Sequence, residues 1–209
     1  MKRSISVVLT AVLMIILTAC ASDSAGEKIN KSFKAMEGYT ASVKVTVTGS
    51  KDTEVYELRQ SWKRPDCYRT EVIKPEELCG TVSIRNGDTL YFQGADEPGI
   101  QMEYNVTDEG KDFLFLSDFL EEYYAGEVLP ELIPDENNLV LLKGARQGTH
   151  ESRFTQNLWI NAENGLPEYL VTYDVKGDEV LRVEFEEFSL NPNFPDSAFL
   201  PEDLPADVS

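Results

Sequence analysis

The stretch Tyr39–Thr48, with the sequence YTASVKVTVT, decides the fold of this chain. Its apolar residues, from Tyr39 to Val47, occupy every second position, and threonine, serine and lysine fill the positions between them. Such alternation is typical of a β-strand with one buried and one solvated face, as found in antiparallel sheets. The sequence GSKD at positions 49–52 follows directly and predicts a turn.

Further strand-like segments cover most of the chain. We expect strands over 56–62, 68–74, 81–85, 89–93, 100–106, 139–142, 153–160, 166–173 and 180–190. Asn86-Gly87 is a strong signal for a tight hairpin turn between two of them. The tail from Pro192 to Ser209 is expected to be extended and held in place by Phe194 and Phe199.

Two segments have helical periodicity instead. Apolar residues between Ile29 and Met36 follow the spacing of one helix face, and the capping-box sequence Ser24-x-x-Glu27 precedes them. The second segment, 111–124, is apolar and aromatic around most of its circumference, so we expect a largely enclosed helix.

Together these elements predict an α+β fold, a curved antiparallel half-barrel sheet of about ten strands wrapped around one or two helices. A large antiparallel sheet twists and curls, and its apolar concave face must be covered. The aromatic-rich helix over 111–124 is the expected filling. No linker or internal repeat divides the sequence, so residues 27–209 are expected to form a single domain.

The N-terminus has the pattern of a bacterial lipoprotein signal. Met1-Lys2-Arg3 precedes a short apolar run, and Leu17-Thr18-Ala19-Cys20 follows it. We expect residues 1–19 to be removed, residues 20–26 to form a tether, and Cys20 to carry fatty acyl chains such as palmitate. Two chains suffice to anchor a protein on the outer face of the cytoplasmic membrane or of a spore membrane. An ordinary signal peptide and an uncleaved anchor are the alternatives.

The charge of the chain is strongly acidic, with 19 basic and 37 acidic residues and a formal net charge of −18. Such a surface repels nucleic acid and anionic lipid head groups, so no nucleic-acid partner is expected. A protein that docks on this surface is expected to be basic rather than acidic. The excess charge also serves solubility.

Cys67 and Cys79 remain after lipidation of Cys20, in a compartment where disulfides form. The two residues flank an expected hairpin whose turn lies near Pro75, which places Cys79 opposite about Ile73. Cys67 is then about six residues further along the strand, and at roughly 3.3 Å per residue this separation is too large for a bridge. We therefore expect the two thiols to stay unpaired.

Few residues suggest catalysis. His150 is the single histidine and lies in a polar loop, which disfavours most metal sites and Ser-His-Asp arrangements. Adjacent carboxylates such as Glu186-Glu187 are expected to point apart along a strand and to be poor acid–base pairs. We expect neither an enzyme, nor a metal site, nor a cofactor.

Several short motifs give the chain a resemblance to a known family. The residues are WKRPDCYR at 62–69, Lys74-Pro75, IRNGDTLY at 84–91, LWIN at 158–161 and Phe194-Pro195. In this order and spacing they resemble the LolA/LolB-like lipoprotein carrier superfamily, and within it the clostridial germination lipoprotein GerS family. The unusually acidic balance and the two cysteines depart from the patterns of these families.

The resemblance implies a non-enzymatic, membrane-anchored binding module, a partner and activator of a spore-cortex cell-wall amidase in sporulation and germination. The alternative is a LolA/LolB-like carrier or acceptor, which holds lipid or lipoprotein acyl chains as an apolar ligand on its concave face. Trp62 and Tyr68 are candidate residues at the mouth of such a cavity. The resemblance gives Arg69 an inward or rim position, whereas a surface arginine is the simpler interpretation.

Overall fold

The computed structural model describes residues 25–95, 99–103, 113–125, 132–134, 138–144, 151 and 153–201. Within these ranges, eleven strands form one sheet in the order β6-β5-β4-β3-β2-β1-β11-β10-β9-β8-β7, and all neighbouring strands are antiparallel. The elements are α2 (Ala25–Lys34), β1 (Gly38–Thr48), β2 (Thr53–Lys63), β3 (Cys67–Lys74), the 3-10 helix η1 (Glu76–Leu78), β4 (Val82–Asn86), β5 (Thr89–Gln93), β6 (Ile100–Glu103), α3 (Leu116–Ala125), β7 (Leu132–Pro134), β8 (Leu139–Lys143), β9 (Thr155–Asn161), β10 (Pro167–Tyr173) and β11 (Glu179–Leu190).

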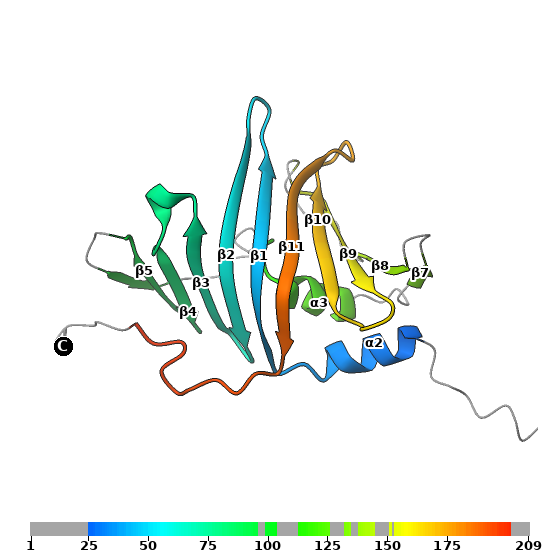
Figure 1. Ribbon diagram of the computed structural model, residues 1–209, viewed down its shortest axis with the longest axis horizontal. Helices are drawn as coiled ribbons and strands as arrows, with labels where there is room; N and C mark the ends of the chain where they lie inside the picture. The colour runs from blue at the N-terminus through cyan, green and yellow to red at the C-terminus, as the bar shows by residue number, and fades with distance from the viewer. Residues whose placement is uncertain are drawn as a thin grey trace, which may run out of the picture.

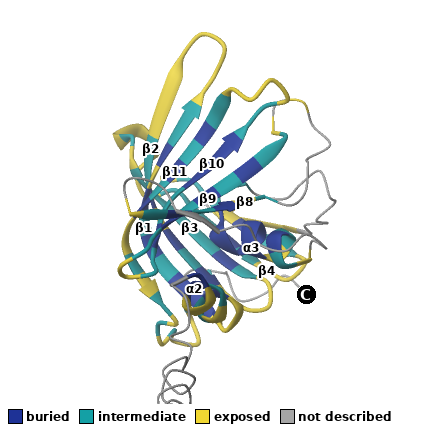
Figure 2. Ribbon diagram, turned by 90° about the vertical axis from the view of Figure 1, so that its right-hand side faces the viewer, coloured by how far each residue is buried: buried dark blue, intermediate teal, exposed yellow. Residues whose placement is uncertain are grey.

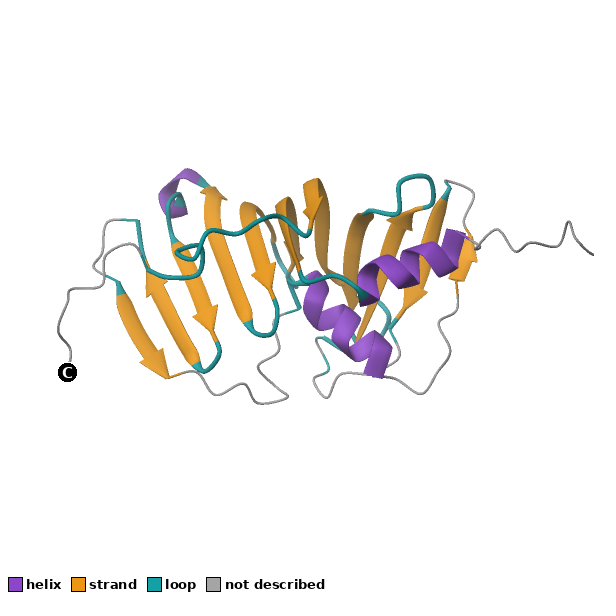
Figure 3. Cartoon of the chain, turned by 90° about the horizontal axis from the view of Figure 1, so that it is seen from below, coloured by secondary structure: helices purple, strands orange, loops and turns teal. Residues whose placement is uncertain are grey.

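The sheet is open and curved, and both α-helices lie on its concave side (Figures 1 and 3). Most residues of α3 and many residues of the central strands are buried, whereas the tips of the long hairpins are exposed (Figure 2). The predicted α+β fold, an antiparallel half-barrel sheet around helices, is confirmed. The helix over 111–124 begins later than predicted, since Phe113 and Leu114 precede α3.

Strand β1 lies in the middle of the sheet because its two neighbours are β2, the next strand in the sequence, and β11, the last. Its predicted alternation is confirmed: Tyr39, Ala41, Val43 and Val45 are at most 3% exposed, whereas Lys44 is exposed. The hydrophobic side chains of this strand therefore form the centre of the main core, against α3 and α2.

A β-bulge in β11 changes the faces of its last residues. The register of β1 and β11 shifts between Thr40 and Ser42, and Glu187 has a φ of 45°. The bulge turns Phe188 inward, where its ring stacks on Tyr39 with centroids 5.2 Å apart. Glu186, which pairs with Ser42, and Glu187, which accepts a hydrogen bond from Ser42, are both exposed on the convex face. The expectation that these adjacent carboxylates point apart is therefore wrong.

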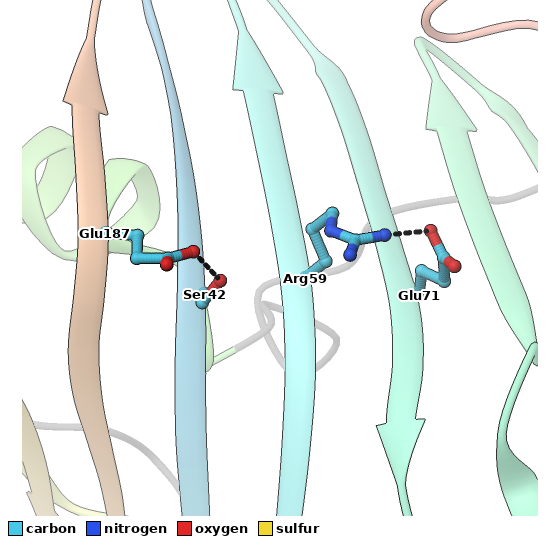
Figure 4. A network of polar contacts seen from close by, with 4 residues as sticks. All are labelled: Ser42, Arg59, Glu71 and Glu187. Carbon is cyan, nitrogen blue, oxygen red and sulfur yellow. Dashed lines mark hydrogen bonds and ion pairs between the residues drawn. The ribbon is translucent and has the colours of Figure 1, made fainter.

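The convex face of the central strands is polar. Ser42 donates a hydrogen bond of 3.0 Å to the Glu187 carboxylate, and Arg59 forms a 3.2 Å ion pair with Glu71 (Figure 4). Further ion pairs on this face join Lys44 to Glu184 and Lys74 to Glu57. Exposed pairs of this kind contribute little to stability, so their main effect is to keep this face hydrated.

A second, smaller core lies on the convex side of β4 and β5. Ile84, Tyr91 and Phe199 are each at most 6% exposed, and the rings of Phe194 and Phe199 are in contact, with centroids 5.1 Å apart. The tail reaches this position past the lower ends of β2 to β4 (Figure 1). The prediction that two phenylalanines hold the tail is confirmed for the part up to residue 201.

Two further sequence predictions have a clear outcome. Cys67 and Cys79 are both free thiols, as predicted.

Strand β7 lies where the sequence analysis predicts no strand. Its edge position beside β8 explains why a short segment ending at Pro134 is tolerated in the sheet. Ser24, Tyr104, Val106 and His150 lie outside the described residues.

Candidate functional site

Helix α3 is held on the concave face by buried polar side chains of the sheet. Gln60, which is fully buried in β2, donates from Nε2 to the Leu114 carbonyl oxygen at 3.2 Å. The Tyr39 hydroxyl accepts a 3.2 Å hydrogen bond from the Leu116 backbone N–H. Because the first N–H groups of a helix have no partner within the helix, the tyrosine satisfies a donor that burial would otherwise leave unpaired.

Gln156 makes a similar contact from β9, which lies on the other side of β1 in the strand order. Its Nε2 donates to the Phe113 carbonyl oxygen and to Thr172 Oγ1, both at 2.9 Å. The residues before α3 are therefore attached to strands on either side of β1. This attachment fixes where α3 begins and how closely it packs on the concave face of the sheet.

A third contact joins α3 to β3. The Tyr68 hydroxyl donates a 2.7 Å hydrogen bond to Asp118 Oδ1, and the Tyr68 ring packs edge-on against Phe115, with centroids 4.9 Å apart. The Arg85 guanidinium lies 3.7 Å from the centroid of the Tyr68 ring. Burial, followed by the charge of Asp118, raises the pKa of the Tyr68 hydroxyl above its ordinary value, so this hydroxyl remains a donor at physiological pH.

The three residues predicted as a site lie on two different faces of the sheet. Trp62 and Tyr68 are on the concave face and belong to the main core, with 6% and 7% exposed. Arg69 is on the convex face, because it pairs with Ser61 and Ile84 and neighbours Tyr68 along the strand. The structure thus brings Trp62 and Tyr68 together and separates them from Arg69. A ligand-binding role for these residues stays a prediction.

The concave face has a second part, which α2 and α3 do not cover (Figure 3). Phe92 of β5 is 40% exposed, and Ile100 and Met102 of β6 are 54% and 43% exposed. Phe92 pairs with Ile100 and Leu90 pairs with Met102, so all four side chains lie on one face. We call Leu90, Phe92, Ile100 and Met102 the edge patch.

The register shows that the edge patch is on the concave face. Phe92 pairs with Ser83, Ser83 with Thr70, and Thr70 with Gln60, whose side chain contacts the segment before α3. Paired residues of neighbouring strands point to the same side of a sheet. The helix-filled part of the concave face therefore continues directly into an exposed apolar part.

Sequence reasoning missed the edge patch. Alternation predicts that Ile100 and Met102 share a face, but it assigns that face to the core. Their exposure follows from the position of β5 and β6 at the end of the sheet. The sequence gives no signal for this exposure, because the residues of such an edge strand alternate in the same way as those of a central strand.

The described residues contain no group of three or more histidine, cysteine, aspartate or glutamate side chains arranged to hold a metal ion. No helix among the described residues is long and apolar enough to cross a membrane. Cys20 and the signal sequence lie outside the described residues.

Comparison with known proteins gives a distant relative with a role in sporulation. The chain is 22% identical over 214 residues to the sporulation protein YdcC of Bacillus subtilis (strain 168). The match covers 95% of this chain and 60% of YdcC. The chain thus spans about three fifths of the length of this relative.

Solved structures of the same fold include protein complexes and isolated domains. A chain in the structure of the CwlD amidase from Clostridioides difficile in complex with the GerS lipoprotein matches with a TM-score of 0.50 and 22% identity, over 81% of this chain and 95% of that chain. An uncharacterized conserved protein from Thermus thermophilus matches with a TM-score of 0.53 and 13% identity, over 88% and 96% of the two chains. The LolA superfamily protein NE2245 from Nitrosomonas europaea matches with a TM-score of 0.42 and 14% identity, over 86% and 99%.

At these identities the likeness to solved structures concerns the fold. The resemblance expected from the sequence is confirmed at the level of the fold by the structure of the GerS–CwlD complex. Residues 1–199 match the family described as "Sporulation protein YdcC-like", which is nearly the whole sequence. The chain therefore belongs to the YdcC-like family of sporulation proteins.

Proposed function

We propose that this protein is a lipid-anchored, extracytoplasmic binding module that binds a cell-wall amidase or another wall enzyme in sporulation and germination, without catalysing a reaction itself. Its anchor is Cys20, on the outer face of the cytoplasmic membrane or of a spore membrane. The observation that carries the proposal is the edge patch, an exposed apolar surface beside a concave face that a fixed helix already fills.

The exposed apolar side chains of the edge patch lie next to one another, which is typical of a binding surface. Single exposed apolar side chains are common on proteins, whereas a contiguous exposed group often marks an interaction site. Phe92 and Met102 belong to residue types that are enriched in protein–protein interfaces. The complex of GerS with the CwlD amidase supports the choice of partner, because it places a lipoprotein in complex with an amidase.

A carrier of acyl chains is the second candidate, since the edge patch is apolar. A carrier that encloses an acyl chain along the whole concave face needs space between α3 and the sheet. Phe115, Leu116 and Phe119 fill this region, and each is at most 3% exposed. Opening that space breaks the hydrogen bonds of Gln60 and Gln156 to the segment before α3. This cost favours a protein partner over an enclosed lipid.

Affinity purification from sporulating cells tests the proposal. The chain is tagged at its C-terminus and compared with the double variant Phe92→Ser/Met102→Ser. The matched control is Val175→Ser/Leu200→Ser, because these side chains are similarly exposed, at 50% and 51%, and lie outside the edge patch. We expect a wall enzyme to co-purify with the wild type and the control, and about tenfold less with the edge-patch variant.

Two results would count against the proposal. If no amidase or other wall enzyme co-purifies and deletion of the gene leaves the cortex muropeptides unchanged, the protein does not serve wall modification. If native mass spectrometry of the purified protein shows a bound lipid, and the edge-patch variant loses that lipid, the carrier function is the better conclusion.

A further inference from the structure

The exposed face of α2 is basic in an otherwise acidic protein. Lys28, Lys31 and Lys34 are spaced by three residues and exposed, whereas Ile29 and Phe33 on the opposite side of the helix are at most 3% exposed. Periodicity of this kind places the three lysines on one face. A shallow depression in this face is lined by Glu27, Asn30, Lys31, Lys34 and Ala35.

Arg64, at the turn after β2, adds a fourth positive charge at the end of this helix. Its Nε donates to the Met36 carbonyl oxygen at 2.8 Å, and its Nη2 donates to the Lys34 carbonyl oxygen at 3.3 Å. We call Lys28, Lys31, Lys34 and Arg64 the basic patch. Residues 25–38 contain two acidic side chains, Glu27 and Glu37, whereas the whole chain has 37 acidic against 19 basic residues.

The position of the basic patch in the chain limits its distance from the proposed anchor. Residue 25, the first of α2, follows Cys20 by five positions in the sequence. A fully extended chain spans at most about 3.6 Å per residue, so the start of α2 lies within roughly 18 Å of the lipidated residue. An acylated Cys20 would therefore hold this basic face next to the membrane surface.

We propose that the basic patch docks on the head groups of anionic phospholipids and sets the orientation of the anchored domain. Clusters of lysine and arginine near a membrane anchor are attracted to anionic lipids over about a Debye length, roughly 8 Å at physiological ionic strength. The acidic remainder of the domain is repelled by the same surface. The two forces turn the hairpin tips of β1–β2 and β10–β11, which lie at the opposite end from α2, away from the membrane (Figure 1).

This inference rests on the anchor at Cys20, and the test separates the two. The mature protein is purified from membranes, its mass is measured for the diacylglycerol group, and it is reconstituted in two kinds of vesicle. One is phosphatidylcholine alone, and the other contains about one third phosphatidylglycerol. A membrane-impermeant amine reagent then labels exposed lysines, and mass spectrometry quantifies the label at each position.

We expect labelling of Lys28, Lys31 and Lys34 to fall by about threefold or more in the anionic vesicles, and to recover at about 1 M salt, where the Debye length is roughly 3 Å. Lys51 and Lys176, in the turns at the two hairpin tips, are internal controls whose labelling stays unchanged. Equal labelling of the α2 lysines in both vesicle types would overturn the proposal.

Charge-reversal variants provide the second readout. In Lys31→Glu/Lys34→Glu, we expect Lys28 to be labelled equally in both vesicle types. The matched control Lys51→Glu/Lys176→Glu keeps the protection of Lys28. A mature protein without acyl groups would overturn the anchor, and sedimentation of that protein with the same two vesicle types then tests the basic patch by itself.

Discussion

The Tyr68 hydroxyl donates a 2.7 Å hydrogen bond to the Asp118 carboxylate, which joins strand β3 to the first turn of α3. Both side chains are buried, with 7% and 8% exposed. On the far side of Tyr68, Arg85 lies over its ring, and the edge patch follows on the next strands. This bond therefore marks the boundary between the filled and the exposed parts of the concave face.

Loss of this hydrogen bond destabilises the protein. In Tyr68→Phe a buried carboxylate loses a donor, and hydrogen bonds to charged groups are worth about 1.5–3 kcal/mol. We expect the free energy of unfolding in urea to fall by about 2 kcal/mol. The control is Tyr123→Phe, because the buried Tyr123 hydroxyl has no hydrogen-bond partner among the described residues. Its effect should be within about 0.5 kcal/mol, and an equal loss in both variants would contradict the role of Asp118.

Alkaline pH should weaken the fold. Burial raises the pKa of Tyr123 to about 12 and raises the pKa of Tyr39 well above its ordinary value of 10.0. Between about pH 10 and 12 the unfolded chain therefore loses tyrosine protons that the folded chain keeps, and stability decreases as pH rises. Denaturant unfolding at about pH 8, 10 and 11.5 measures this loss. In Tyr123→Phe the free energy of unfolding should decrease less over the same pH interval. A decrease equal to that of the wild type would show that Tyr123 does not contribute to the pH dependence.

The hydrogen bond by which Gln156 holds the segment before α3 can be tested by replacing Gln156 with an apolar residue of similar size. Gln156→Met removes the donor to the Phe113 carbonyl and to Thr172 Oγ1, and each unsatisfied buried group costs about 1–3 kcal/mol. We expect a loss of about 2–3 kcal/mol by urea unfolding. Gln101→Met, at an exposed position of β6, should stay within about 0.5 kcal/mol. Wild-type stability of Gln156→Met would show that the hydrogen bonds of Gln156 do not help to hold α3.

The tail is expected to hold the outer strands mainly through the ring of Phe199, the more buried of its two phenylalanines. Phe199 is 6% exposed against Ile84 and Tyr91, whereas its neighbour Leu200 is 51% exposed. Phe199→Ala should cost about 3 kcal/mol, the lower end for a buried aromatic residue, and Leu200→Ala less than about 0.5 kcal/mol. Hydrogen exchange should also quicken in β4 and β5 of the first variant. Unchanged exchange there would mean that the tail does not stabilise these strands.

Much of the secondary structure could be predicted from the sequence, because its signals are local. The hairpin turn predicted at Asn86-Gly87 is one case: Asn86 pairs with Thr89, so Gly87 and Asp88 are the central residues of the turn, and Gly87 has a positive φ of 57°. The alternation of Tyr39–Thr48 is another, since a side-chain period of two assigns each residue to one face of a strand. These features need no knowledge of distant residues.

The start of α3 could not be predicted in the same way. Phe113 and Leu114 fit the helical pattern, yet they precede the helix, and their carbonyl oxygens accept hydrogen bonds from Gln156 and Gln60. These partners lie 43 and 54 residues away in the sequence. The bulge at Glu187 is similar, because it places Phe188 against Tyr39, which lies on a strand far away in the sequence.

By itself, the sequence determined most of the strands, the aromatic helix and the antiparallel curved sheet, because each depends on periodicity and turn chemistry within a short segment. The tail was expected to be extended throughout, but residues 196–199 form turns. Only the tertiary structure decided that β1 pairs with β11, that Arg69 lies on the face opposite Tyr68, and that the concave face is filled at one end and exposed at the other. The physical reason is that exposure of a side chain depends on what the neighbouring elements cover. An apolar residue such as Ile100 has the same local pattern whether a helix lies over it or not.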